Sequence, residues 1–212
     1  MLLAFDTATP RVTVALHDGE DVVVELASEE TLRHGEQLAP LVERAMREAG
    51  IVRQDLTAIA VGVGPGPFTG LRVGLVTART LGFVLEIPVY GVCTLDVLAV
   101  EAVDTGTVIG DFVVATDARR KEVYLASYDE AGHRLDGPVV EKPAVVATEA
   151  LVVGEGPVLY PEHFPNGCAP TRPSAGWLAR TVVDERAELH DPEPLYLRRP
   201  DAVAPGPRKP AS

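Results

Sequence analysis

Cysteine is scarce in this sequence. Among 212 residues only Cys93 and Cys168 occur, and they form no CxxC pair. Two separated cysteines argue against a disulfide framework and against a zinc site built from thiolates. A reducing, cytoplasmic location is therefore the expectation.

Long hydrophobic runs are also lacking. The uncharged stretch Thr57 to Leu71 is shorter than the roughly 20 residues that a membrane-spanning helix needs, and glycine and proline interrupt it. The first residues, MLLAFD, reach Asp6 without the basic start of a signal peptide. Because 46% of the residues are apolar, the chain can form a core, and we expect a globular protein outside the membrane.

Positive charge is in short supply. Lys and Arg number 19 against 31 Asp and Glu, a net charge of -12, which argues against a stand-alone nucleic-acid binder. The densest basic run, Arg119, Arg120 and Lys121, has two open interpretations: a solvated turn, or a contact with a polyanion that another molecule supplies. Residues 200–212 contain four prolines and no apolar periodicity, which predicts a disordered tail.

Apolar patterning predicts an α/β arrangement in the first half of the chain. A helix is expected over Glu36 to Ala49, where apolar residues recur at helical spacing and Gly50 follows as a C-cap. A second helix is expected after a glycine-rich stretch and should reach about Phe83. Strands are predicted at residues 2–5, 12–17, 22–26, 57–63 and 87–92.

The second half begins with a segment similar to the start of the first. Residues 113–130 align with residues 2–19 without a gap, which places Asp117 on Asp6. In both segments a strand ends at the aspartate, a turn follows, and a hairpin closes the unit. One such unit in each lobe is how a duplicated actin-like ATPase fold is built, so we predict two α/β lobes of mixed sheet flanked by helices. The lobes are expected at residues 1–100 and 101–199.

The stretch GVGPGPFTGLRVG, Gly62 to Gly74, looks like a phosphate-binding loop, because an apolar strand runs into glycines and then into a helix. A P-loop requires GxxxxGK[ST], and no lysine follows these glycines; the GxGxxG spacing of dinucleotide-binding loops is missing too. Pro65 and Pro67 also remove two backbone N–H donors that an anion would need. We therefore interpret the stretch as a tight turn, with Thr69 capping the helix that follows.

One face of that helix is almost bare, because Gly70, Gly74, Ala78 and Gly82 recur every four residues. Each glycine within a helix costs roughly 1 kcal/mol relative to alanine, so close approach by another element must offset the loss. That element is either part of the same lobe, its sheet or the helix at residues 36–49, or a helix of another subunit. The sequence leaves both alternatives open.

These motifs together carry a family resemblance. GPGPFTGLRVG, IPVYGVCTLDVLA and DARRKEVY, supported by HGEQLAPLV and LYLRRPDA, are similar to the bacterial TsaB (YeaZ) family over residues 1–202. The resemblance implies the duplicated actin/Hsp70/sugar-kinase fold. It also implies an accessory subunit that organises a TsaD-type catalytic subunit, which transfers a threonylcarbamoyl group to adenosine 37 of tRNA.

In the catalytic relatives, two histidines of an HxxxH helix hold a metal, and this helix follows an IPVxGVN-like strand. Here that strand is residues 87–92, Cys93 stands at the asparagine place, and Thr94 and Leu98 stand at the histidine places. Leucine cannot bind a metal, and no other histidines show HxxxH or HExxH spacing. We expect no metal site, no catalytic residue and no autonomous activity.

The resemblance also sets the expected partners. This protein is expected to associate with a TsaE-type ATPase through the complex and with tRNA only indirectly. No membrane is expected to be involved. No cofactor of its own is expected, whereas ATP at a joint interface and a homodimer in isolation are left open. Asp6 has two interpretations: Mg²⁺ and nucleotide binding, as in actin-like kinases, or hydrogen bonds to its own turn. A small stand-alone actin-fold ATPase or phosphotransferase is the alternative function.

Two helices of the first lobe form a bundle with the catalytic relative in this family, and the resemblance assigns that role here to residues 36–49 and to the helix with the glycine stripe. The inward or outward direction of each residue cannot be assigned from sequence. If the stripe faces a partner, Gly74→Leu should leave the monomer folded and block pairing. The candidate partner contacts are Leu41, Ala45, Gly70, Leu71, Gly74, Leu75 and Ala78.

Overall fold

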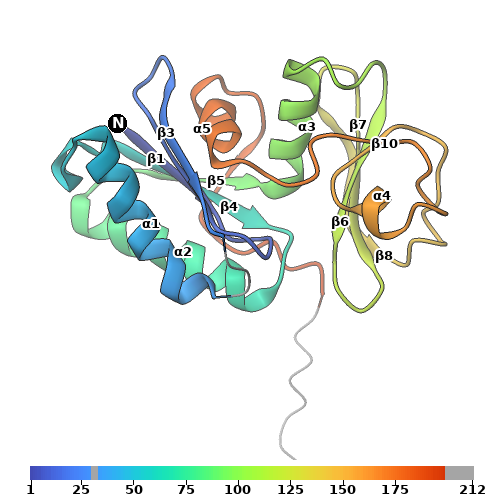
Figure 1. Ribbon diagram of the computed structural model, residues 1–212, viewed down its shortest axis with the longest axis horizontal. Helices are drawn as coiled ribbons and strands as arrows, with labels where there is room; N and C mark the ends of the chain where they lie inside the picture. The colour runs from blue at the N-terminus through green and yellow to red at the C-terminus, as the bar shows by residue number, and fades with distance from the viewer. Residues whose placement is uncertain (30–32, 199–212) are drawn as a thin grey trace, which may run out of the picture.

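Each half of the chain begins with three antiparallel strands (Figure 1). The computed structural model describes residues 1–29 and 33–198, so the tail predicted at residues 200–212 lies outside the described residues. The strands are β1 (Leu2–Asp6), β2 (Thr13–His17) and β3 (Val22–Ala27) in the first half, and β6 (Phe112–Asp117), β7 (Val123–Tyr128) and β8 (Arg134–Glu141) in the second.

Parallel strands extend both sheets in the same way. In the first sheet β4 (Ala58–Gly64) pairs with β1, and β5 (Val89–Cys93) pairs with β4. In the second, β9 (Val152–Val153) pairs with β6, and β10 (Gly167–Cys168) pairs with β9. The strand orders β3-β2-β1-β4-β5 and β8-β7-β6-β9-β10 are equivalent, which confirms the predicted duplication and the two-lobed actin-like fold. β11 (Leu189–His190) adds a sixth strand beside β5.

Helices cover both faces of the first sheet. α1 (His34–Ala49) and α2 (Phe68–Leu85) lie side by side on one face, and α5 (Ala175–Val183) lies on the other (Figure 1). η1 (Arg53–Asp55) leads into β4, and α3 (Thr94–Asp104) packs against β6 and β7. The second half has fewer helices: α4 (Gly156–Leu159) is one turn in the position of α2, and residues 142–151, which the structure describes, contain no helix.

The two lobes are interlocked. α5 comes from the second half of the sequence, yet its Leu178 packs with Leu2 and Ala4 of the first sheet. α3 crosses in the other direction, since its Leu98 packs with Phe112 of the second sheet. The predicted boundary at residue 100 falls inside α3, so the lobes are defined by their sheets and exchange helices across the boundary.

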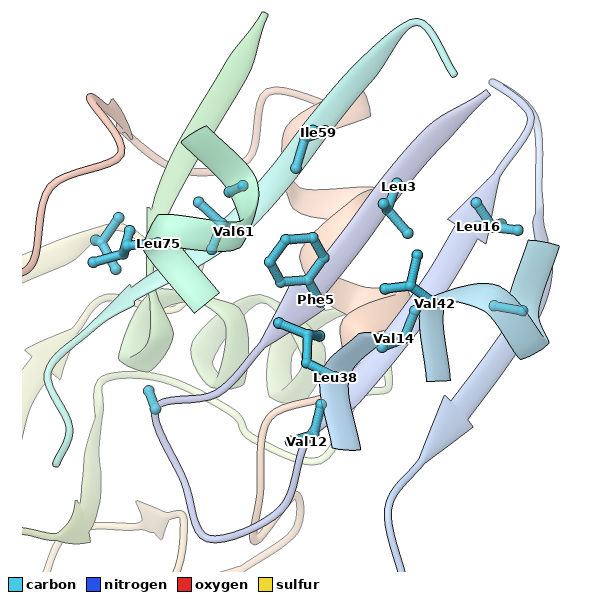
Figure 2. Packing of buried hydrophobic residues seen from close by; sticks show 14 of the residues in the cluster. Leu3, Phe5, Val12, Val14, Leu16, Leu38, Val42, Ile59, Val61 and Leu75 are labelled. Carbon is cyan, nitrogen blue, oxygen red and sulfur yellow. The ribbon is translucent and has the colours of Figure 1, made fainter. Parts of the chain in front are cut away.

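Figure 2 shows the core that joins the first sheet to α1 and α2. Phe5 of β1 lies at its centre, near Leu38 and Val42 of α1, while Leu75 reaches the core from α2. Burial of one such large apolar side chain contributes about 1.5–3 kcal/mol. Several of them together therefore fix both helices on the sheet.

The helix ends follow the sequence signals in part. α1 starts at His34, slightly before the predicted start, and Gly50 with a φ of 68° forms the predicted C-cap. α2 starts at Phe68 after Pro67, which stands at the N-cap position, and no side chain caps its first turn. The predicted Thr69 cap is therefore wrong: the N-cap lies two residues earlier, at Pro67, and Thr69 lies inside the first turn.

Candidate functional site

The glycine-rich turn lies at the carboxyl end of β4, against the turn that follows β1. A Cβ atom at Gly66 would collide with the carbonyl oxygen of Ala8, and one at Gly70 with that of Thr7. At Gly62 a Cβ atom would collide with the Asp6 carboxylate. The glycines thus allow the chain's own turn to approach closely, and the space beside them is filled by protein rather than open to a phosphate.

Asp6 is 1% exposed and has hydrogen-bond partners on both carboxylate oxygens. Its Oδ1 accepts from the backbone N–H of Ala8 at 2.6 Å, and its Oδ2 accepts from the Thr94 hydroxyl at 2.7 Å. Burial raises the pKa of this carboxyl group, although both hydrogen bonds act in the opposite direction. This geometry matches the interpretation in which Asp6 forms hydrogen bonds within its own turn. The bond from Thr94 also connects this turn to the start of α3.

Among the described residues, a small cleft lies between the lobes. The cleft is bordered by Thr9 and Pro65 of the first lobe and by Asp117 and Arg172 of the second, and its volume of about 10 Å³ fits roughly one water molecule. Asp117 is held in its own turn as well, because its Oδ1 accepts from the backbone N–H of Arg119 at 2.8 Å. In this conformation the cleft has no room for a nucleotide.

The residues at the histidine places of the catalytic relatives are buried. Thr94 is bonded to Asp6, Leu98 belongs to the core, and burial raises the pKa of the Cys93 thiol. Among residues 1–29 and 33–198, no three His, Cys, Asp or Glu side chains gather where they could hold a metal ion.

The glycine stripe of α2 faces inward. A Cβ atom at Gly74 would collide with the Thr7 hydroxyl oxygen, and one at Gly82 with the side chain of Val89. Of the two alternatives left open by the sequence, these contacts match the one in which the stripe packs inside its own lobe. Six of the seven predicted partner contacts are buried in the chain itself, and only Leu41 is half-buried; the six are Ala45, Gly70, Leu71, Gly74, Leu75 and Ala78.

The opposite side of α2 contains none of the predicted partner contacts. Val76, Phe83 and Val84 are 62%, 85% and 67% exposed, and their spacing of seven and eight residues places them on one side of the helix. We call these three residues the outer face. By length and composition alone, α2 is long and apolar enough to cross a membrane, which was not expected. In the structure, one apolar face of α2 packs on the sheet, and a second apolar face is exposed.

A second feature of α2 involves the C-terminal segment, residues 194–198. The rings of Phe68 and Tyr196 stack with their centroids 5.3 Å apart. The Arg72 guanidinium lies 3.6 Å from the centroid of the Phe68 ring, and its Nε donates to the Tyr196 hydroxyl at 3.3 Å. The Leu195 N–H donates to the carbonyl of Val63 at 2.9 Å, which ties the segment to the end of β4.

The basic run forms the turn between β6 and β7. Arg119, Arg120 and Lys121 all have left-handed backbone conformations, with φ of 60°, 55° and 60°, and all are exposed. Arg119 pairs with Asp117 at 3.1 Å. The interpretation as a turn is confirmed, and a contact with a polyanion stays a prediction.

Comparisons with known proteins identify a matching family and several relatives of this chain. The family model described as "TsaD: tRNA N6-adenosine threonylcarbamoyltransferase" matches residues 22–163. A protein of Mycobacterium tuberculosis, named only as uncharacterized, is 44% identical over 209 residues, which cover 95% of this chain and 93% of the relative. The tRNA threonylcarbamoyladenosine biosynthesis protein TsaB of Escherichia coli is 36% identical over 174 residues, which cover 76% of this chain and 74% of the relative.

A solved structure with a related sequence also has a similar fold. YeaZ from Pseudomonas aeruginosa is 31% identical to this chain, with a TM-score of 0.74 over 92% of this chain and 99% of that chain. Sequence and structure agree over most of both molecules, so the chain belongs to the TsaB (YeaZ) family.

Proposed function

We propose that this protein is a non-catalytic subunit that binds and organises a TsaD-type catalytic subunit for threonylcarbamoyl transfer to adenosine 37 of tRNA. Family membership supports the proposal, since relatives from Escherichia coli and Bacillus subtilis are named tRNA threonylcarbamoyladenosine biosynthesis protein TsaB. The observation that carries it is the outer face of α2, which nothing in the described part of the chain covers.

Clustered exposed apolar side chains on one helix mark a surface that another molecule covers. α1 lies beside α2 on the same side of the sheet, and it exposes charged residues such as Glu43, Arg44 and Arg47 (Figure 1). Together the helices offer an apolar centre with a charged border, the usual composition of a protein interface. The catalytic subunit is proposed to cover the outer face and to meet α1 at its border.

The closed cleft supports the absence of autonomous catalysis. Asp6 is bonded within its own turn, and about 10 Å³ of space cannot admit a nucleotide. ATP is therefore proposed to bind at an interface that the complex creates. This protein is proposed to associate with the TsaE-type ATPase and with tRNA only through the catalytic subunit, in the cytoplasm and away from any membrane. These two observations also count against the alternative of a stand-alone actin-fold ATPase or phosphotransferase.

Sedimentation velocity of this protein mixed with a TsaD-type subunit tests the proposal. Phe83→Asp should abolish co-sedimentation, because a carboxylate would be buried in an apolar contact. Its melting temperature should match that of the parent, since Phe83 is 85% exposed in the free subunit. Ile109→Asp, at a residue 89% exposed in the loop before β6, is the matched control and should co-sediment like the parent. A Phe83→Asp variant that also co-sediments like the parent would overturn the proposal.

A further inference from the structure

A groove of about 520 Å³ runs beside the outer face of α2. One wall is α2 itself, and the other is the C-terminal segment, which the stacked rings of Phe68 and Tyr196 hold in place. We call it the arginine groove, because two arginines of α2 line it. Its principal lining residues are Arg72, Val76, Arg79, Thr80, Pro194 and Tyr196.

The two arginines of this groove have no carboxylate partner among the described residues. Arg72 stacks on Phe68 and bonds to Tyr196, while Arg79 forms neither an ion pair nor a hydrogen bond with the rest of residues 1–29 and 33–198. α2 contains no Asp or Glu that could neutralise them. Ion pairs with carboxylates are formed instead by Arg33, Arg44, Arg119, Arg134, Arg172, Arg186 and Arg198.

We propose that the arginine groove binds an acidic segment of the TsaD-type subunit, with a carboxylate paired to Arg79 and an adjoining apolar side chain against Val76 and Tyr196. This inference rests on the proposed function and adds the chemistry of the partner to it. Charge complementarity supports it: a net charge of -12 repels acidic segments from most of this molecule, whereas the groove offers two positive charges.

Continuity with the outer face supports the same occupant. Val76 belongs both to the outer face and to the groove, so one partner surface covers the two without a gap. Arginine and tyrosine are enriched among the residues that dominate binding energies, and a guanidinium holds a carboxylate with two parallel hydrogen bonds. The apolar outer face therefore supplies contact area, and the arginine groove supplies orientation and partner choice.

Charge reversal at Arg79 tests the inference in the mixed complex. Arg79→Glu should weaken binding of the catalytic subunit by about tenfold or more at low salt, and the difference should shrink as salt screens the repulsion. Its melting temperature should equal that of the parent because Arg79 is exposed. Lys142→Glu, an equal charge reversal at an exposed residue of the second lobe, is the matched control and should bind like the parent.

Arg79→Lys allows the occupant to be identified. It keeps the charge and supplies an amine that a carbodiimide couples to a neighbouring carboxylate, so mass spectrometry should find residue 79 joined to Asp or Glu of the catalytic subunit. Equal binding by Arg79→Glu and the parent would overturn the inference while the proposed function stands. Coupling to a second copy of this chain would also overturn it. A parent that binds no catalytic subunit would overturn both.

Discussion

Among the described residues, burial raises the pKa of three carboxyl groups, those of Asp6, Asp96 and Glu101. Asp6 and Asp96 have hydrogen-bond partners: Thr94 donates to Asp6, and the Tyr128 hydroxyl donates to Asp96 at 2.7 Å. Glu101 of α3 differs, because its Oε2 is buried without a hydrogen-bond partner in the described structure. Burial, and next the nearby Glu25 carboxylate, raise the pKa of Glu101 to about 7.

Glu101 should make the stability of the protein depend on pH. Its pKa is about 7 in the folded chain against 4.5 as the ordinary value, so folding takes up a proton between these limits. The contribution of Glu101 to the stability of the folded protein is fully present below pH 4.5, and it is lost as the pH rises through about 7. Glu101→Gln should remove the pH dependence that comes from this carboxyl group. The variant should therefore gain stability relative to the parent from pH 5 to pH 8.

Urea unfolding of the parent and of Glu101→Gln across this range measures the difference, and comparing them cancels the contributions of Asp6 and Asp96. Glu43→Gln, on the exposed side of α1, is the control for loss of one negative charge. A constant stability difference between Glu101→Gln and the parent would contradict the account.

At the scale of the elements, α2 shows what the sequence could and could not predict. The helix and its glycine stripe follow from residue spacing, but both of its faces are apolar: Leu71 and Leu75 point inward, whereas Val76 and Phe83 are exposed. A helix that is apolar on both sides gives no periodic signal for which side faces the core. α1 is amphipathic, so its inward residues Leu38 and Val42 follow from the pattern.

The second lobe sets a different limit on prediction. The similarity of residues 113–130 to the start of the first lobe predicts their hairpin, and the two sheets have equivalent strand orders. Its later strands β9 and β10 have only two residues each, too few for a periodicity. The exchange of α3 and α5 between lobes depends on contacts between distant segments, which local patterning does not contain.

The inward direction of the glycine stripe gives a prediction about stability. Gly74→Leu should lower the free energy of unfolding by about 1–3 kcal/mol, because the added side chain would collide with Thr7 in a packed contact. Gly35→Ala on α1 is the matched control: its Cβ would lie 4.0 Å from Val73, so this variant should melt at or above the parent temperature. Thermal melts of the isolated subunit measure both, and an unchanged melting temperature for Gly74→Leu would show that the stripe is not packed internally.

At the scale of the whole molecule, two features stand out: the cleft between the lobes is small, and α2 exposes an apolar surface. The glycine-rich turn is closed by the turn after β1, and the C-terminal segment links the lobes, since Arg198 donates to the Ala118 carbonyl at 2.9 Å and pairs with Glu122. The outer face and the arginine groove lie together on α2. The molecule is therefore proposed to act through its partner.

Reconstituted transfer of a threonylcarbamoyl group to tRNA is the decisive test of whether this protein acts through its partner. Purified TsaD-type and TsaE-type subunits would be assayed with tRNA and the threonylcarbamoyl donor, with the parent, Phe83→Asp or Ile109→Asp added. We expect incorporation into adenosine 37 with the parent and with Ile109→Asp, little with Phe83→Asp, and none when this protein is the only subunit present. Incorporation by this protein alone, or full support of the reaction by Phe83→Asp, would contradict this expectation.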